Sequence, residues 1–327
     1  MGPTLLVTGS GRALGVRRYD RSVGARESDG GQRSALSVVI PTYQRERDCH
    51  LCLRSLSEVA DRTGIEIELI VVEQGPEPAY EIPADFDGLW LFSVVNGASY
   101  ARNIGLDYVT HDAVMFFDDD GLAQDGVADL VAEHAAGGAA VVSGRMRTPD
   151  GLVSRGGGQR VEITQRTAFR VFIEGTAAWD RTWLVDVGGF DERLGPPLAY
   201  GAEEGAEALS RVLRTGHRGV FVPADVLVHP AIDRSPPGKA FRYGRGTAGA
   251  AWLSPGGWTV GYAVVSGVRR VGGVVRSLFR RDVVGAKHRV GWLAGLLVGA
   301  ATGWSLRRLP RRHTDRPVVI RHDTRTL

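Results

Sequence analysis

Three aspartates near the middle of the chain are the strongest candidates for chemistry. Residues 114–117 are Val, Met, Phe and Phe, a pattern typical of a buried strand, and Asp118, Asp119 and Asp120 come directly after them. Carboxylates packed this closely repel one another, and burying one of them alone is costly. A divalent cation with oxygen ligands removes both penalties, so Asp118 and Asp120 are candidate ligands for Mg²⁺ or Mn²⁺. The alternative is a solvated acidic turn ahead of a helix that starts near Asp125.

Alternating strands and helices are predicted ahead of these aspartates. The predicted strands are 36–40, 67–72, 90–95 and 114–117, and the helices are 46–60 and one that ends near Val109. This order is typical of the α/β class, in which a mostly parallel sheet has right-handed crossovers and ligands bind beyond the carboxyl ends of the strands. The side chains expected at that rim are Thr42, Tyr43, Glu73, Arg102 and the three aspartates.

Four motifs occur in an order that is typical of one enzyme family. They are SVVIPTY at 37–43, ARNIG at 101–105, FFDDD at 116–120 and GGFDERLG at 188–195, and the segment 201–229 follows them with a helix and a strand. Together they resemble glycosyltransferase family 2. The resemblance implies a GT-A fold, which is a Rossmann-like, mostly parallel sheet flanked by helices. It also implies inverting transfer of a sugar from a nucleotide diphosphate donor to a hydroxyl acceptor.

The resemblance further implies which residues would hold a UDP-, dTDP- or GDP-linked donor. The base and ribose would lie against the ends of the first two strands, and the guanidinium of Arg102 would bind a phosphate. Asp118 would either join Asp120 on the Mg²⁺ or Mn²⁺ ion or hold the ribose. His229 would complete the metal site, with a structural histidine as the alternative. The donor set is Pro41, Thr42, Tyr43, Glu73, Arg102, Asp118 and Asp119, and the metal set is Asp118, Asp120 and His229.

An acceptor hydroxyl needs a general base, which family members supply from acids at the start of a helix. This helix start reads AEEGAEALSR at 202–211. Counting back from Arg211 aligns Gly205 with the position at which many relatives carry the acidic base. Glu204 is then the first candidate base and Glu203 the second. The alternative is that these acids only stabilise the positive end of the helix dipole.

The composition fits a globular protein with one large α/β domain and an appendage, since the chain has 327 residues, of which 43% are hydrophobic and 24% charged. The abundance of Gly, Ala, Val and Arg is typical of a bacterial coding bias. A net charge of +3 is too small to argue for a nucleic acid partner. The only cysteines, Cys49 and Cys52, fall at helical spacing with Leu53 and Leu56, so we predict that they are core residues of a helix and not a zinc or redox site.

The character of the chain changes after Pro237. Two apolar stretches, 258–268 and 290–304, have basic flanks and tryptophans but fall short of the roughly 20 residues of a membrane-spanning helix. They are typical of helices on an anionic membrane surface, and the alternative is a hairpin packed on the catalytic domain. No secretory signal is visible, so we expect a cytoplasmic protein, peripheral on the inner face of the cell membrane. The predicted parts are a flexible leader (1–34), a GT-A catalytic domain (35–232) and a C-terminal helical, membrane-associated region with a flexible basic tail (233–327).

Two functions fit these observations. The first is a metal-dependent inverting glycosyltransferase acting on a glycan, a glycolipid or a natural product. The second is a catalytically inactive relative that binds a nucleotide or a glycan as a partner protein, for which Gly205 and the irregular glutamates argue. A nucleotidyltransferase is a weaker alternative, because residues 41–43 do not form a glycine-rich phosphate loop.

Overall fold

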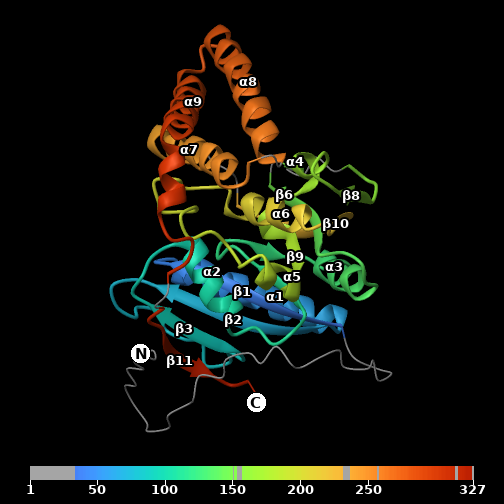
Figure 1. Cartoon of the computed structure of the whole chain (residues 1–327). Helices are drawn as coiled ribbons and strands as arrows, with labels where there is room; N and C mark the ends of the chain where they lie inside the picture. Colours follow the sequence, from blue (N-terminus) through green and yellow to red (C-terminus); the bar gives the residue numbers. More distant parts are fainter. Residues whose placement is uncertain are drawn as a thin grey trace.

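The predicted parallel sheet is present and carries the rest of the molecule (Figure 1). The computed structural model describes residues 34–149, 151–152, 157–230, 236–255, 258–313 and 316–325, so the predicted leader lies outside it except for residue 34. Strands β1 to β4 run parallel in the spatial order β3-β2-β1-β4. Their bounds are Ala35–Tyr43, Glu66–Gln74, Leu89–Ser93 and Ala113–Phe116. The α/β class with a mostly parallel sheet is therefore confirmed.

Beyond β4 the sheet becomes mixed, which the sequence did not reveal. Strand β9 pairs antiparallel with both β4 and β6, and β10 runs parallel to β6 but antiparallel to the short strand β5. The β5–β10 pairing sets Val228 opposite Leu122, so the end of β10 lies beside the turn that follows the three aspartates. The bounds are Leu122–Ala123 (β5), Val141–Thr148 (β6), Gly151–Leu152 (β7), Val161–Ile163 (β8), Ala177–Asp180 (β9) and Gly219–Val228 (β10).

Helices cover both faces of the sheet. Alternate residues of β1 point to opposite faces, so Val38 packs with α1 and α3 on one side while Val39 packs with α2 and α6 on the other. Cys49 and Cys52 of α1 are fully buried in the first of these cores, which confirms their prediction as core residues. The bounds are Glu46–Thr63 (α1), Ala98–Leu106 (α2), Gly126–Ala135 (α3), Ala168–Val171 (α4), Glu174–Thr176 (η1), Arg181–Asp186 (α5) and Glu204–Arg214 (α6).

Three longer helices form the predicted helical appendage. Helix α7 (Pro237–Leu253) packs across the domain, and α8 (Trp258–Phe279) and α9 (Val283–Thr302) project from it as a hairpin (Figure 1). Among the described residues, no helix has the length and apolar character needed to span a bilayer. Helices α7 and α9 approach closely at glycines: a Cβ on Gly244 would lie 1.9 Å from the carbonyl oxygen of Trp292, and one on Gly295 would lie 2.0 Å from that of Phe241.

The end of the chain returns to the sheet, which corrects our expectation of a flexible basic tail. After the short helix η2 (Gly303–Arg308), strand β11 (Val319–Asp323) pairs antiparallel with the edge strand β3. The pairing satisfies the backbone groups that β3 would otherwise expose. It is fastened by buried or half-buried ion pairs, because Arg321 reaches Glu73 and Arg325 reaches Glu68. Basic composition suggested a solvated tail, whereas these arginines serve as anchors.

We predict that Gly244→Ala lowers the free energy of unfolding by about 1–3 kcal/mol, because the new methyl group would overlap the α9 backbone. Gly238→Ala is the matched control in the same helix, since no atom lies within 4 Å of a Cβ built there. The control should be neutral or slightly stabilising. Urea unfolding followed by circular dichroism measures both changes. Equal stability of the two variants would contradict the close helix contact.

Candidate functional site

The ends of the parallel strands form one polar rim, as the sequence predicted. Thr42, at the end of β1, donates from Oγ1 to Asp119 Oδ2 at 2.8 Å, and its Oγ1 also lies 2.9 Å from the hydroxyl of Tyr80. The guanidinium of Arg45 bridges Asp119 and Asp120, with Nη1 at 3.1 Å and 2.7 Å from their carboxylate oxygens. Burial raises the pKa of Asp119 to about 6, against the opposing effect of the Thr42 and Arg45 contacts. Through its contacts with Thr42 and Arg45, Asp119 thus holds the turn at residues 118–120 in place.

The residues predicted as metal ligands lie near one another. Asp120 Oδ1 is 3.3 Å from His229 Nε2, and Asp118 is close enough to interact with the charges of both. The hydrogen bond to Asp120 raises the pKa of His229 to about 9, so the imidazole must release this proton before it can bind a cation. Within the described part of the chain, no three His, Cys, Asp or Glu side chains form a ready-made metal cluster. The donor set of two carboxylates and one imidazole suits a cation of the Mn²⁺ or Mg²⁺ type.

Arg102 of α2 is the buried centre of the rim. Its side chain is 8% exposed and is surrounded by three carboxylates. Nη1 lies 2.9 Å from Glu204 Oε1, Nε lies 2.9 Å from Glu174 Oε1, and Nη2 lies 3.7 Å from Asp118 Oδ1. These acids raise the pKa of Arg102 although burial opposes them, so the guanidinium stays charged. A phosphate that binds Arg102 would therefore contact a guanidinium group that these acids already pair with.

The two candidate bases from the sequence occupy different environments. Glu204 is buried at the start of α6 and pairs with Arg102. Glu203 has a left-handed backbone with φ of 72°, and its Oε1 accepts a hydrogen bond from Thr247 of α7 at 2.9 Å. Burial raises the pKa of Glu203 to about 7. Glu204 therefore belongs to the cluster around Arg102, whereas Glu203 faces the helical appendage.

Glu174 is a residue of this site that sequence reasoning missed. It lies in η1, far from Gly205 in sequence, yet a Cβ built on Gly205 would be only 2.1 Å from Glu174 Oε2. The Glu174 carboxylate thus fills the space that a side chain at position 205 would need. Burial raises its pKa to about 8, with the charge of Glu204 adding to the effect and Arg102 opposing it. No local motif marks Glu174. The one sequence signal was Gly205, whose missing side chain leaves room for a carboxylate from another segment.

Glu73 is deeply buried at the end of β2. Its carboxylate accepts hydrogen bonds from the backbone N–H groups of Ala79 and Tyr80 at 2.7 and 3.1 Å and from Trp90 Nε1 at 2.9 Å, and it also pairs with Arg321. Glu73 therefore holds the loop that carries Tyr80. Its predicted contact with a donor base stays a prediction. Of the other predicted donor residues, Tyr43 is 40% exposed and Pro41 is partly exposed on β1.

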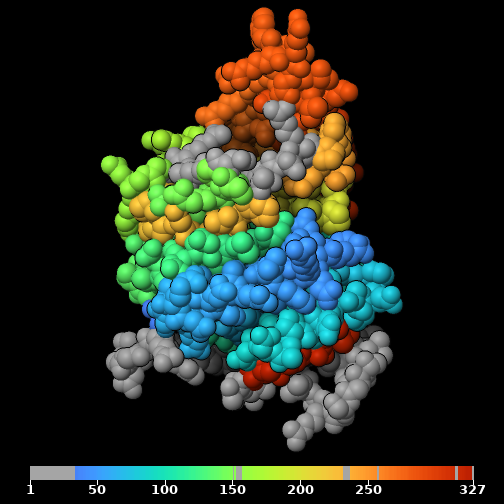
Figure 2. Space-filling view, turned by 180° about the vertical axis from the view of Figure 1, so that it is seen from behind, coloured from blue at the N-terminus to red at the C-terminus, as the bar shows by residue number. Residues whose placement is uncertain are grey.

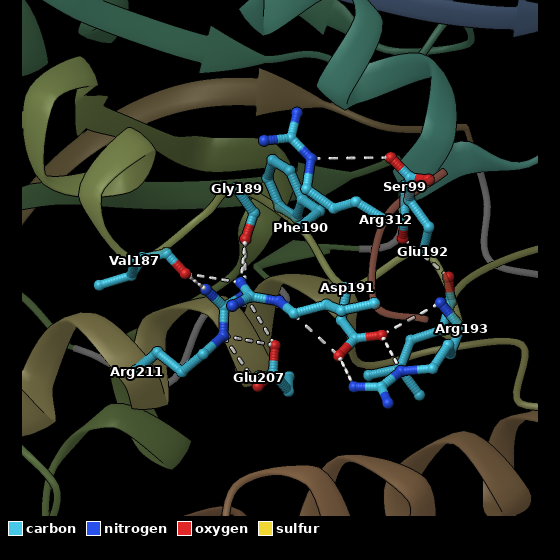
Figure 3. Close-up of polar contacts among 12 residues, drawn as sticks. Ser99, Val187, Gly189, Phe190, Asp191, Glu192, Arg193, Glu207, Arg211 and Arg312 are labelled. Atoms are coloured by element: carbon cyan, nitrogen blue, oxygen red, sulfur yellow. Dashed lines mark hydrogen bonds and ion pairs between the residues drawn. The ribbon is translucent and has the colours of Figure 1, made fainter. Parts of the chain in front are cut away.

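The glycine-rich turn at 188–195 is held by ion pairs (Figure 3). Asp191 accepts from Arg193 Nε at 2.7 Å, and Arg211 pairs with Glu207 while donating to the carbonyl oxygens of Val187 and Gly189 at 2.6 Å each. Glu207 and Arg211 therefore order the turn.

Three aromatic residues, Trp179, Trp183 and Phe190, lie in or near this turn. Trp179 and Phe190 are fully buried, and Phe190 packs on Phe116 and lies 5.7 Å below the Arg102 guanidinium. Only Trp183 is partly exposed, and its ring lies against His217. Trp179 and Phe190 are thus core residues, and only Trp183 reaches the surface.

Comparisons with known proteins agree with this geometry. The model of the family described as "Glycosyl transferase family 2" matches residues 37–190. The solved structure of S. aureus TarS has 16% identity and a TM-score of 0.50, and the match covers 67% of this chain and 39% of that chain. A structure of S. aureus TarS 1-349 in complex with UDP-GlcNAc has 14% identity and a TM-score of 0.51, with 82% and 90% coverage. At these identities the likeness concerns the fold. No curated protein matches the chain.

The matched residues include the β1 motif, the Arg102 segment, the aspartates and the start of the glycine-rich turn, which are the parts that meet at the rim. Glu204 and His229 lie beyond them and complete the same cluster. Residues 37–190 of this chain therefore form a glycosyl transferase family 2 domain.

Proposed function

We propose that this family 2 glycosyltransferase moves a sugar, with inversion, from a nucleotide diphosphate donor to an acceptor hydroxyl. The observation that carries the proposal is the rim at which Thr42 holds Asp119, Asp120 contacts His229 and Arg102 gathers three acids. The complex of S. aureus TarS 1-349 with UDP-GlcNAc supports a UDP-linked donor ahead of a dTDP- or GDP-linked one.

The leaving diphosphate gains negative charge as the glycosidic bond breaks. A divalent cation, when bound by Asp118, Asp120 and His229, would neutralise this charge as a Lewis acid. Arg102 would stabilise the leaving phosphates through its guanidinium, which the surrounding acids keep charged and oriented. Arg45 fixes the aspartates through its bridge to Asp119 and Asp120. Thr42 and Tyr80 would line the nucleoside side of the site.

The general base that we favour is Glu174, with Glu204 and then Glu203 as the alternatives. Its carboxylate lies where a side chain at position 205 would lie, and its pKa of about 8 makes the ionised carboxylate a stronger base than an ordinary glutamate. In this scheme Glu174 takes the proton of the acceptor hydroxyl while Glu204 holds Arg102. The alternative function was an inactive relative, because Gly205 stands where many relatives carry the acidic base. The Glu174 carboxylate of η1 occupies the space of the missing side chain, so the glycine no longer argues against catalysis.

The helical appendage supports peripheral attachment of a cytoplasmic protein to an anionic membrane. The face of α8 that points away from α9 is a nearly continuous apolar stripe of exposed residues, which are Val260, Val264, Val268, Val271, Val275 and Leu278. Phe279, at the tip of the hairpin, is 86% exposed and precedes Arg280 and Arg281. Apolar side chains beside arginines are typical of a helix that lies in a bilayer interface.

Loss of the proposed metal ligand should abolish donor chemistry. We expect Asp120→Ala to lower Mn²⁺-dependent UDP-sugar hydrolysis by about 100-fold or more, because the charge of the leaving group is no longer neutralised. Asp61→Ala, at an exposed position of α1, is the control and should keep full activity. Hydrolysis is measured as UDP release with and without chelator. Hydrolysis that survives both Asp120→Ala and chelation would refute the metal-dependent function.

Removing the Glu174 carboxylate and placing an acid at position 205 tests whether Glu174 is the general base. Glu174→Ala should lower sugar transfer by about 100-fold or more, since the base is lost. The double variant Glu174→Ala/Gly205→Asp should regain at least about tenfold, because the aspartate enters the space vacated by Glu174. Gly205→Asp alone should be inactive from the clash, and exposed Glu77→Ala serves as the control. Full transfer by Glu174→Ala would return the role of the base to Glu204 or Glu203.

Membrane attachment is tested at the tip of the hairpin. The protein should co-sediment with vesicles that contain phosphatidylglycerol, and Phe279→Asp should weaken binding by about tenfold or more, because a buried aromatic side chain contributes roughly 1.5–3 kcal/mol. Val94→Asp, at an exposed site on the catalytic domain, is the control. The proposal fails if the wild type ignores these vesicles or if the two variants bind alike.

A further inference from the structure

A cavity of about 440 Å³ lies between the hairpin and the catalytic domain. Its walls come from α4 through Phe169, from α8 through Tyr262 and Ser266, and from both hairpin helices through basic residues. Seen from behind, the surface is hollowed beneath the hairpin (Figure 2). This volume is within the range of small-molecule sites and is sufficient for a phosphate with an attached sugar or polyol. None of its lining residues belongs to the donor or metal sets described above.

The polar groups that line the cavity are donors or cations. Arg269, Arg270 and Arg289 contribute three guanidinium groups and His288 an imidazole, while Tyr262 and Ser266 add hydroxyls. Among the described lining residues there is no acidic side chain. Guanidinium groups bind phosphate and carboxylate oxygens through paired N–H donors, so this lining favours an anion, although Asp282 already lies 4.0 Å from Arg289 Nη1.

Two of the arginines are held in place by the protein. The Arg270 guanidinium stacks over the ring of Trp292 at 3.7 Å from its centre. Arg289 donates from Nη1 to Ser277 Oγ at 2.8 Å and crosses Gly273, where a Cβ would lie only 2.6 Å from Arg289 Nε. Fixing these side chains in advance lowers the entropy cost of binding an anion. Arg269 is exposed and completes the set from the outer side.

The cavity adjoins the acceptor side of the site. Tyr262 hydrogen-bonds Glu203, and the charge of Arg270 acts on the same carboxylate. Glu203 directly precedes Glu204, which pairs with Arg102, and Gly205, over which Glu174 lies. The cavity is therefore connected to the proposed acceptor side of the site through Tyr262 and Glu203.

We infer that this cavity binds a phosphate group of the acceptor, so that the acceptor is a phosphate-bearing hydroxyl compound such as a polyol phosphate or a phospholipid-linked glycan. The inference rests on the proposed transferase function, because it assigns the acceptor to that site. Arg269, Arg270 and Arg289 bind the phosphate oxygens, and Tyr262 lies between this phosphate and the catalytic acids.

The test measures anion binding with the donor site blocked by saturating UDP and Mn²⁺. The probes are inorganic phosphate and glycerol phosphate by calorimetry, and phosphatidic acid vesicles against phosphatidylcholine vesicles by co-sedimentation. We expect Arg269→Glu to weaken binding by about tenfold or more, and Arg269→Gln by less, because a charge-assisted contact is lost. Arg276→Glu is the matched control, since Arg276 is exposed on the same helix but does not line the cavity.

The outcomes separate the sources and the hypotheses. Dependence of glycerol phosphate binding on Arg269 supports a soluble acceptor, and dependence that is confined to phosphatidic acid vesicles supports a lipid-linked one. If neither probe binds, or if Arg269→Glu and Arg276→Glu behave alike, the inference is overturned. UDP-sugar hydrolysis, measured on the same variants, should stay at the wild-type rate. An intact hydrolysis rate without anion binding rejects only the inference, whereas anion binding without hydrolysis or transfer rejects the proposed function.

Discussion

The burial of Arg102 is the constraint on which the site depends. A guanidinium with 8% exposure would be strongly destabilising without partners, and its partners come from three separate segments: Asp118 after β4, Glu174 in η1 and Glu204 at the start of α6. Removal of any one acid leaves the charge less well paired, and removal of Arg102 leaves three acids that repel one another. The ion cluster therefore fixes the distance between the aspartate turn, on the proposed donor side, and Glu174 and Glu204, on the proposed acceptor side.

A second chain of contacts connects the end of the polypeptide with the same rim. Arg321 of β11 pairs with Glu73, Glu73 binds the backbone of Tyr80, and the Tyr80 hydroxyl lies 2.9 Å from Thr42 Oγ1. Thr42 in turn donates to Asp119. Helix α7 and its C-cap residue Ser254 make corresponding contacts on the proposed acceptor side, where Thr247 donates to Glu203 and Ser254 donates to Glu207. Residues of α7, Ser254 and β11 thus help to position the side chains of the site.

The sequence predicted the parts of this site that local patterns encode. Continuous apolar strands, followed directly by Thr42 or by the aspartates, could be read from short windows, because the buried parallel strands are apolar on both faces. The place of Glu174 in the site could not be predicted, because its carboxylate meets Gly205 only in the folded chain, where η1 packs against the start of α6. Strand β11 was also missed, because its arginines suggest solvation until Glu68 and Glu73 are seen to face them. Contacts between distant segments were therefore the information that the sequence lacked.

The charge of the hairpin argues for an anionic surface or ligand and against a second copy of the chain. Residues 258–302, which form α8, α9 and the connection between them, include seven arginine and lysine residues but a single acid, Asp282. Pairing the apolar stripe of α8 with the same stripe of another copy would bring like charges together without acids to balance them. The phosphate-bearing acceptor or the anionic bilayer proposed above would match this excess of positive charge. Arginines thus accompany the exposed apolar stripe of α8 and also line the cavity beneath the hairpin.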